Sequence, residues 1–247
     1  MTKIIKHKSE IAKTIDGLRP DGGAVGFVPT MGALHEGHLS LLEKCRADND
    51  VCVASVFVNP TQFNDPSDYK KYPRLESEDL KLLEKQSCDV VFMPAVEEIY
   101  PNGDFKTFSP DLGGLENILE GKYRPGHFNG VVTIVKKLFE VVRPDRAYFG
   151  QKDYQQYLVI KKMDELYGMG VEVIKCPIVR EAGGLAMSSR NMHLNGDQRK
   201  DATVLYDTLI KAKELLGSKS AGEVQKWAEG HLGKMPFVDL EYFGVRD

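Results

Sequence analysis

The sequence predicts an α/β protein in which a doubly wound parallel sheet is followed by a second, smaller α+β domain. Across the first two thirds of the chain, short runs that are apolar on both faces alternate with amphipathic segments. Such runs are typical of parallel strands that helices cover on both sides of a sheet. Near residues 177–184 the alternation stops and longer helical segments follow. We therefore place a first domain at residues 1–178 and a small C-terminal domain at residues 179–247.

The spacing of apolar residues predicts the individual elements. Strands are expected at residues 24–28, 51–58, 89–93, 146–149 and 171–175, with a last strand-like run at 238–243. Helices are expected at residues 39–45, 76–85, 131–142, 154–167, 198–216 and 222–232. The strongest helical pattern runs from Val131 to Val142, and Pro144 ends it. Ligands bind at the carboxyl ends of strands in such sheets, so the turns after each strand are the first candidates for a site.

The bulk composition narrows the classes of function. The chain has 247 residues, a formal net charge of −3 and an apolar content of 42%, which suit a soluble protein with a substantial core. Nothing in this balance predicts a nucleic-acid or anionic-membrane partner. The apolar runs are too short to span a bilayer, and no leader segment is visible, so we expect a cytoplasmic protein. The four cysteines match neither zinc nor CxxC spacing and are expected to be small buried residues.

The first candidate motif, residues 29–38, lies between the first long strand and its helix. Gly32 and Gly37 permit tight turns and close approach of the backbone to a ligand. His35 and His38 are three residues apart, so both can face an anion from the first helical turn, where free N–H groups attract phosphate. A cationic or hydrogen-donating imidazole there would stabilise charge on a phosphate leaving group. An isolated His-x-x-His is often a surface pair, but this position after a buried strand favours a functional site.

Two further motifs carry phosphate-binding groups. At residues 150–153, Gly150 allows close approach and Lys152 offers a compact cation for a phosphate oxygen, whereas Asp153 suits a helix cap equally well. At residues 186–191, two serine hydroxyls and an arginine could surround a triphosphate, although a capping serine pair beside a solvated arginine is an equal alternative. Together with the first motif, they favour a nucleotide held between the two domains.

Three weaker signals involve polar residues and a loop. Gln62, Gln155 and Gln156 carry amides that suit a small substrate with hydroxyl and carboxylate groups, although such side chains are usually solvated. Residues 124–130 form a Gly- and Pro-rich loop of the kind that often orders over a ligand. The acidic residues 76–79 could supply a magnesium ligand, but we favour their ordinary role at the start of a helix.

Taken together, the motifs resemble the pantothenate synthetase family, whose members are also called pantoate–β-alanine ligases. The resemblance covers essentially the whole chain and is carried by residues 28–38, 57–63, 72–74, 98–101, 124–128, 149–153 and 188–191. It implies a Rossmann-like domain with a HIGH-type signature at residues 35–38. It further implies that (R)-pantoate and β-alanine are condensed to pantothenate through a pantoyl-adenylate, with ATP and Mg²⁺, releasing AMP and pyrophosphate.

The resemblance also implies roles for individual residues. ATP would be bound by Met31, Gly32, Ala33, Leu34, His35, Glu36, Gly37, His38, Gly150, Gln151, Lys152, Asp153, Val179, Met187, Ser188, Ser189 and Arg190. Gln62 and Gln156 would bind pantoate and β-alanine. The catalytic groups would be His35, Lys152, Arg190 and His38, the last as a proton donor. The resemblance implies a homodimer, since family members are typically dimers joined through the first domain. They usually continue past the position of Asp247, so the lid-like second domain is expected to be short at its end.

Other classes of function stay open on the residues alone. A nucleotidylyltransferase would share the phosphate chemistry, but its phosphate-bearing acceptor would favour basic side chains over the neutral glutamines. A nucleotide-binding regulator would bind ATP without exchanging pyrophosphate, and an interaction module would not need three phosphate-facing turns. The residues do not identify the magnesium ligands or a general base for the amine.

Overall fold

The computed structural model describes residues 2–246, and the chain divides into two compact units, Met1–Ile178 and Val179–Asp247. The first unit contains one parallel sheet with the strand order β1-β4-β3-β2-β5-β6. Its strands are β1 (Lys3–Ile5), β2 (Val25–Thr30), β3 (Val51–Val56), β4 (Val90–Phe92), β5 (Arg146–Gly150) and β6 (Glu172–Cys176). The predicted doubly wound α/β fold is confirmed, and the sheet gains a short first strand that the sequence pattern did not indicate.

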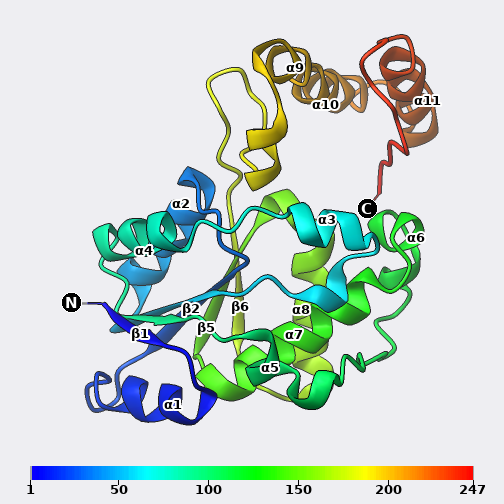
Figure 1. The fold of residues 1–247 in the computed structure, drawn as a ribbon. Coiled ribbons are helices and arrows are strands. Elements are labelled where there is room, and N and C mark those ends of the chain that lie inside the picture. The colour runs from blue at the N-terminus through cyan, green and yellow to red at the C-terminus, as the bar shows by residue number, and fades with distance from the viewer. Residues whose placement is uncertain (1, 247) are drawn as a thin grey trace. The chain divides into compact units, whose positions relative to one another are not determined.

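Helices cover both faces of this sheet (Figure 1). The α-helices of the first unit are α1 (Lys8–Asp16), α2 (Glu36–Asp48), α3 (Pro66–Lys71), α4 (Glu76–Lys85), α5 (Val96–Ile99), α6 (Glu120–Tyr123), α7 (His127–Val142) and α8 (Tyr154–Tyr167). Short 3-10 turns are η1 (Pro60–Gln62), η2 (Pro101–Gly103), η3 (Leu115–Asn117) and η4 (Gln151–Asp153). Every strand and helix expected within residues 24–175 is present, with ends shifted by a few residues.

Two apolar clusters show how the layers pack. Phe27 of β2 points into a cluster that includes buried residues of α1, α7 and α8. Its neighbour Val28 points into a second cluster built with α2 and α4. Successive side chains of a strand alternate between faces, so both faces of β2 are buried, as the continuous apolar run predicts. All four cysteines are unbonded to one another, buried and part of the second cluster, which confirms their expected role as small core residues.

The second unit is mainly helical in its described residues. It contains η5 (Ser189–His193), α9 (Gly196–Asp201), α10 (Val204–Leu215) and α11 (Ala221–Leu232), with one isolated antiparallel bridge between Arg180 and Ala186. The single helix expected at 198–216 is interrupted, because the Thr203 hydroxyl and N–H both bond to the Lys200 carbonyl and form a tight turn. The strand expected at 238–243 is wrong: no strand of this unit offers it a backbone to pair with in the described residues.

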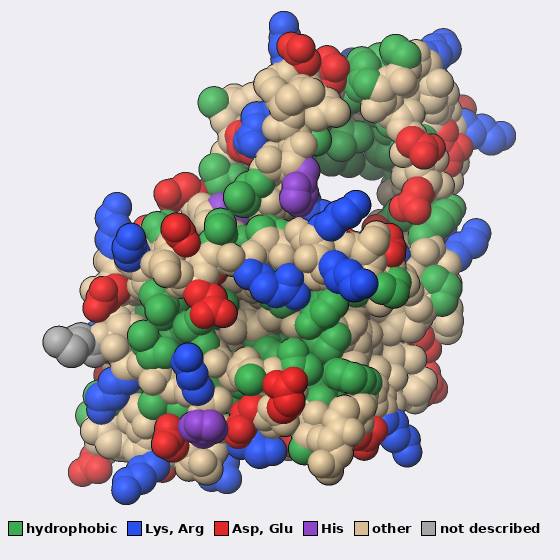
Figure 2. Space-filling model, in the orientation of Figure 1, with side chains coloured by type: hydrophobic (Ala, Val, Ile, Leu, Met, Phe, Trp, Pro, Cys, Tyr) green, Lys and Arg blue, Asp and Glu red, His purple; other side chains and the backbone are tan. Residues whose placement is uncertain are grey.

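The surface carries both signs of charge. On the face that Figure 2 shows, Lys and Arg side chains are interspersed with Asp and Glu, in keeping with the net charge of −3. Within residues 2–246, no helix combines the length and apolar character needed to cross a membrane.

Candidate functional site

The candidate site lies where the order of strands reverses. From β2 the chain adds β3 and β4 on one side, and then β5 and β6 on the other, so the switch point is between β2 and β5. The carboxyl ends of these two strands lead into the loop at residues 31–35 and into η4. Crevices at such switch points are where open α/β sheets bind ligands. Two of the three predicted phosphate-facing turns, at residues 29–38 and 150–153, thus follow strands that are neighbours in the sheet.

His35 and His38 form a reciprocal cap at the start of α2. The ring Nδ1 of His35 accepts the Gly37 N–H at 3.1 Å, and the ring Nδ1 of His38 accepts the His35 N–H at 3.3 Å. The ring centroids are 4.1 Å apart. A neutral imidazole that accepts through Nδ1 carries its hydrogen on Nε2. Both rings therefore hold an Nε2–H donor at a helix N-terminus, which itself favours anions.

His38 is neutral in the ligand-free protein. Burial, as the largest cause, together with the nearby His35 and Lys152, lowers the pKa of His38 from 6.5 to about 3. Of the two forms expected from the sequence, cationic and hydrogen-donating, the structure favours the neutral donor. His38 would then stabilise a phosphate through a hydrogen bond from Nε2.

We expect the His38 ring to keep its neutral Nε2–H form throughout the range of about pH 5 to 8 in which an ordinary histidine titrates. Long-range ¹H–¹⁵N correlation spectra of the ligand-free protein distinguish the two neutral tautomers from imidazolium, and a His38→Asn sample assigns the signal. A His38 ring that became imidazolium with a midpoint near pH 6.5 would contradict this assignment.

Lys152 lies close enough to His38 for its charge to lower the pKa of that ring. It stands in η4 directly after β5, and its ammonium pairs with both carboxylate oxygens of Asp153 at 3.0 and 3.3 Å. Asp153 makes no side-chain cap at the start of α8, so the capping alternative for this residue is wrong. The Lys152 side chain is 38% exposed, so an exchange of Asp153 for a phosphate as its partner needs little rearrangement.

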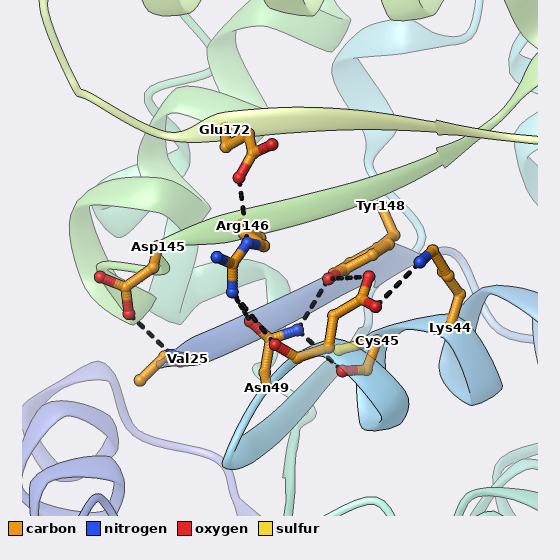
Figure 3. Close-up of polar contacts among 9 residues, drawn as sticks. Val25, Lys44, Cys45, Asn49, Asp145, Arg146, Tyr148 and Glu172 are labelled. Carbon is orange, nitrogen blue, oxygen red and sulfur yellow. Dashed lines mark hydrogen bonds and ion pairs between the residues drawn. The ribbon is translucent and has the colours of Figure 1, made fainter. Parts of the chain in front are cut away.

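A polar network fixes α2 against β5 (Figure 3). Arg146 donates to the Asn49 side chain at 3.2 Å, and Asn49 donates to the Tyr148 hydroxyl at 2.7 Å. The Tyr148 hydroxyl in turn donates to an Asp48 carboxylate oxygen at 3.0 Å, and burial raises the pKa of Tyr148. Since α2 begins with the two histidines and β5 leads to Lys152, these bonds hold the groups of the site in register.

Gln62 is oriented toward the first motif. Its Oε1 accepts from Asn59 Nδ2 at 3.0 Å, and its Nε2 donates to the Met31 sulfur at 3.2 Å. Asn59 is buried, and its Oδ1 accepts from the Tyr100 hydroxyl at 2.7 Å. A thioether is a weak acceptor, so the Gln62 amide N–H is readily available to an oxygen of a substrate.

Residues 124–130 contact the backbone of Gln62 and the neighbouring Asn64. The ring Nδ1 of His127 lies 2.8 Å from the Gln62 carbonyl oxygen, and burial lowers the pKa of His127. Asn64 donates to the Pro125 carbonyl at 2.7 Å. These contacts pack the segment against η1 and its flanks, and the expectation that it orders over a ligand stays a prediction.

Gly130 permits this packing, and Gly130→Ala is expected to disturb it. A Cβ at this position would lie 2.3 Å from the Thr61 carbonyl oxygen. The substitution should destabilise the fold by roughly 1–3 kcal/mol, the usual cost of overpacking, and should raise the KM of the substrate that Gln62 binds. Gly230→Ala in α11 is the control, because a Cβ there meets nothing within 4 Å and should stabilise by roughly 0.5–1 kcal/mol. Denaturant unfolding measures the stability of the two variants, and steady-state kinetics measure their KM values. Equal stability and equal KM for Gly130→Ala and Gly230→Ala would contradict the prediction.

The adjacent glutamines of α8 have different roles. Gln155 donates to the carbonyls of Leu115 and Ile118 at 2.7 and 2.8 Å, and it accepts the Glu120 N–H at 3.1 Å. These three bonds make Gln155 a structural anchor, so its expected contribution to a substrate site is wrong. The Gln156 amide has no hydrogen-bond partner among residues 2–246, which leaves it as the substrate-binding candidate of the pair.

The second unit brings its own predicted residues together. The Met187 N–H donates to the Val179 carbonyl at 3.1 Å, which places these two residues side by side. Asn191 donates to Glu181 at 2.8 Å and so ties the segment at 188–190 to the start of the unit. The roles of these residues in ATP binding stay predictions.

Sequence and structure comparisons identify what this chain is similar to. A sequence model of the pantoate-beta-alanine ligase family matches residues 3–247. A pantothenate synthetase of Thermotoga neapolitana is 49% identical over 99% of this chain and 88% of its own length. The crystal structure of pantothenate synthetase from Thermus thermophilus superposes with a TM-score of 0.87 at 45% identity, covering 95% of this chain and 83% of that one.

A third relative was solved with ligands. The pantoate-beta-alanine ligase from Francisella tularensis, complexed with beta-gamma ATP and beta-alanine, is 37% identical with a TM-score of 0.81. The match covers 94% of this chain and 87% of that one. The switch-point site, the family match along nearly the whole chain and these identities lead to one conclusion: this chain belongs to the pantoate–β-alanine ligase family.

Proposed function

We propose that the protein condenses (R)-pantoate with β-alanine to form pantothenate, using ATP and releasing AMP and pyrophosphate. The observation that carries the proposal is the pair of Nε2–H donors on His35 and His38, beside Lys152, at the switch point of a chain in this family. Two hydrogen-donating rings at the N-terminus of α2, with the cation of Lys152 from η4 nearby, suit the phosphates of a nucleotide.

The first step activates the acid. A carboxylate is a poor acyl donor, because its leaving group would be an oxide. Attack of a pantoate oxygen on the α-phosphorus of ATP forms a pantoyl-adenylate and releases pyrophosphate. Negative charge develops on the departing phosphate, so fixed donors from His35, His38 and Lys152 stabilise the transition state.

The second step forms the amide. The free amine of β-alanine attacks the acyl carbon, AMP leaves with one former carboxylate oxygen, and the amine loses a proton. Gln62 and Gln156 are the groups we assign to holding the substrates, since a neutral amide both donates and accepts hydrogen bonds. Holding both reactants in line supplies much of the rate enhancement in reactions of this type.

The second unit contributes further ATP-binding residues in this proposal. Val179 would bind the adenine, and Met187, Ser188, Ser189 and Arg190 would bind the phosphates. A guanidinium forks onto two oxygens at once, which distinguishes Arg190 from the point charge of Lys152.

Magnesium does not have a ready-made protein site. Among residues 2–246 no three His, Cys, Asp or Glu side chains gather as a metal-binding group. The carboxylate of Asp153 is paired with Lys152, and both oxygens of Asp79 accept backbone N–H groups. The residues therefore do not fit a protein-built cage. We propose that Mg²⁺ binds with ATP through phosphate oxygens, as is common for this ion.

Exchange of labelled pyrophosphate into ATP tests the proposal. With pantoate present and β-alanine absent, we expect exchange, because only the first step and its reversal can occur. Without pantoate we expect none. Exchange that does not require pantoate, or a stable dinucleotide product, would overturn the proposal in favour of nucleotidyl transfer.

Assembly and location are further proposals. We propose a homodimer in the cytoplasm, on the resemblance to the family. Sedimentation equilibrium tests the first statement, and fractionation of cells tests the second.

A further inference from the structure

Asp79 is a buried carboxylate that binds the candidate ATP loop. It lies in the first turn of α4 and is only 1% exposed. Its Oδ2 accepts the Ala33 N–H at 2.9 Å, and its Oδ1 accepts the Leu34 N–H at 2.7 Å. The sequence predicted that the acidic residues 76–79 serve only the start of a helix. In the structure, the Asp79 carboxylate instead binds backbone N–H groups of a distant loop.

The loop that Asp79 binds has a strained backbone. Gly32 and Ala33 both have left-handed conformations, with φ of 77° and 50°. For alanine this region costs on the order of 1–2 kcal/mol, so other contacts must hold the residue there. The two N–H groups that follow the turn point at the Asp79 carboxylate, which supplies such contacts.

The same carboxylate explains why residue 32 is glycine. A Cβ at Gly32 would lie 2.8 Å from Asp79 Oδ2 and 3.0 Å from a methyl carbon of Val56. The loop therefore passes over Asp79 at a distance that only glycine allows. The left-handed backbone of residues 32–33 and the absence of a Cβ at Gly32 both allow the loop to contact the Asp79 carboxylate.

The pKa of the Asp79 carboxyl lies above its ordinary value, because the loop hydrogen bonds offset only part of the cost of burial. Burial raises the pKa of the Asp79 carboxyl, the N–H groups of Leu34 and Ala33 lower it, and the neighbouring Glu78 and Glu76 raise it. A buried carboxylate is tolerated when its oxygens accept hydrogen bonds, which the two loop amides provide.

We propose that Asp79 is a positioning residue for ATP: its carboxylate holds residues 31–34 in the conformation that receives the nucleotide. The inference rests on the proposed function of this loop. Both carboxylate oxygens of Asp79 accept N–H groups of the loop, so we infer that it acts through the loop. Its loss should weaken ATP binding selectively, and pantoate binding much less.

Asp79→Asn tests this with little change of shape. The amide keeps one acceptor but turns a donor toward the other loop N–H. We expect the KM for ATP in pyrophosphate exchange to rise by about 10–100-fold, the scale for a buried charge-assisted hydrogen bond, with the KM for pantoate changed less than threefold. Glu84→Gln is the matched control: it removes the same charge from an exposed position of α4 and should leave both constants unchanged.

Amide hydrogen exchange on the wild-type protein gives a second test that requires no variant to fold. The Ala33 and Leu34 amides should exchange slowly without ATP, because Asp79 accepts both. Rapid exchange at these amides, or a folded Asp79→Asn protein with the KM values of Glu84→Gln, overturns the inference. If wild-type protein shows no pantoate-dependent pyrophosphate exchange, the proposed function fails, and the amide measurement still decides whether Asp79 holds the loop.

Discussion

His38→Asn is expected to lower the rate of adenylate formation by about 10²–10³-fold, the usual effect of losing one fixed donor to developing charge. The choice of asparagine follows from the geometry. Its carbonyl oxygen can replace the ring Nδ1 that accepts the His35 N–H, so the cap of α2 survives. No group of asparagine reaches the position of Nε2, so the donor is lost.

His38→Gln is the matched variant, because its amide N–H extends to about the place of Nε2. We expect it to retain more activity than His38→Asn but to be the less stable of the two, because it lacks an acceptor at the position of Nδ1. Pyrophosphate exchange gives the rates, and thermal unfolding gives the stability. If the asparagine variant is as active as wild type, His38 has no part in the chemistry; if both variants are equally poor, the tautomer assigned to His38 is wrong.

Lys152→Met is expected to lower adenylate formation by roughly 10²-fold, because a phosphate oxygen loses its cation at the switch point. Methionine keeps the length of the side chain and removes the charge. Removing a positive neighbour should also raise the pKa of His38, although burial, the larger cause, keeps that ring neutral. Lys152→Arg should recover part of the rate, since a planar guanidinium replaces a point charge imperfectly.

Lys161→Met in α8 is the control for this substitution, since Lys161 is exposed and lies outside the candidate site. We expect wild-type kinetics from it. Single-turnover measurements of pyrophosphate release separate the chemical step from product release. Equal rates for Lys152→Met and Lys161→Met would remove Lys152 from the mechanism.

Local pattern predicted much of the first unit. The helix expected at 154–167 coincides with α8 (Tyr154–Tyr167), because its apolar spacing and the following Gly168 in a left-handed conformation are local signals. The strand expected at 238–243 failed for the opposite reason. An alternating segment forms a strand only when another backbone pairs with it, and no sequence pattern guarantees that partner.

The candidate site likewise contains residues that local pattern predicts and residues whose roles depend on distant contacts. The turn after β2 was predictable, because glycines and histidines after a buried strand are adjacent in the sequence. Asp79 was not, because its carboxylate binds a residue 46 positions earlier in the chain. Gln155 and Gln156 carry the same side chain at adjacent positions, and only the tertiary contacts of Gln155 with the 115–120 segment separate their roles. Pairings between distant residues decide function here, and local pattern does not contain them.

Transfer of oxygen from the acid to the nucleotide tests the central claim most directly. Pantoate labelled with ¹⁸O in both carboxylate oxygens is incubated with ATP, β-alanine and the enzyme, and AMP is analysed by mass spectrometry. Activation through a pantoyl-adenylate predicts one ¹⁸O atom in each AMP, because the bond between that oxygen and phosphorus persists when the amine displaces AMP. AMP without label, or label in pyrophosphate, would contradict the account.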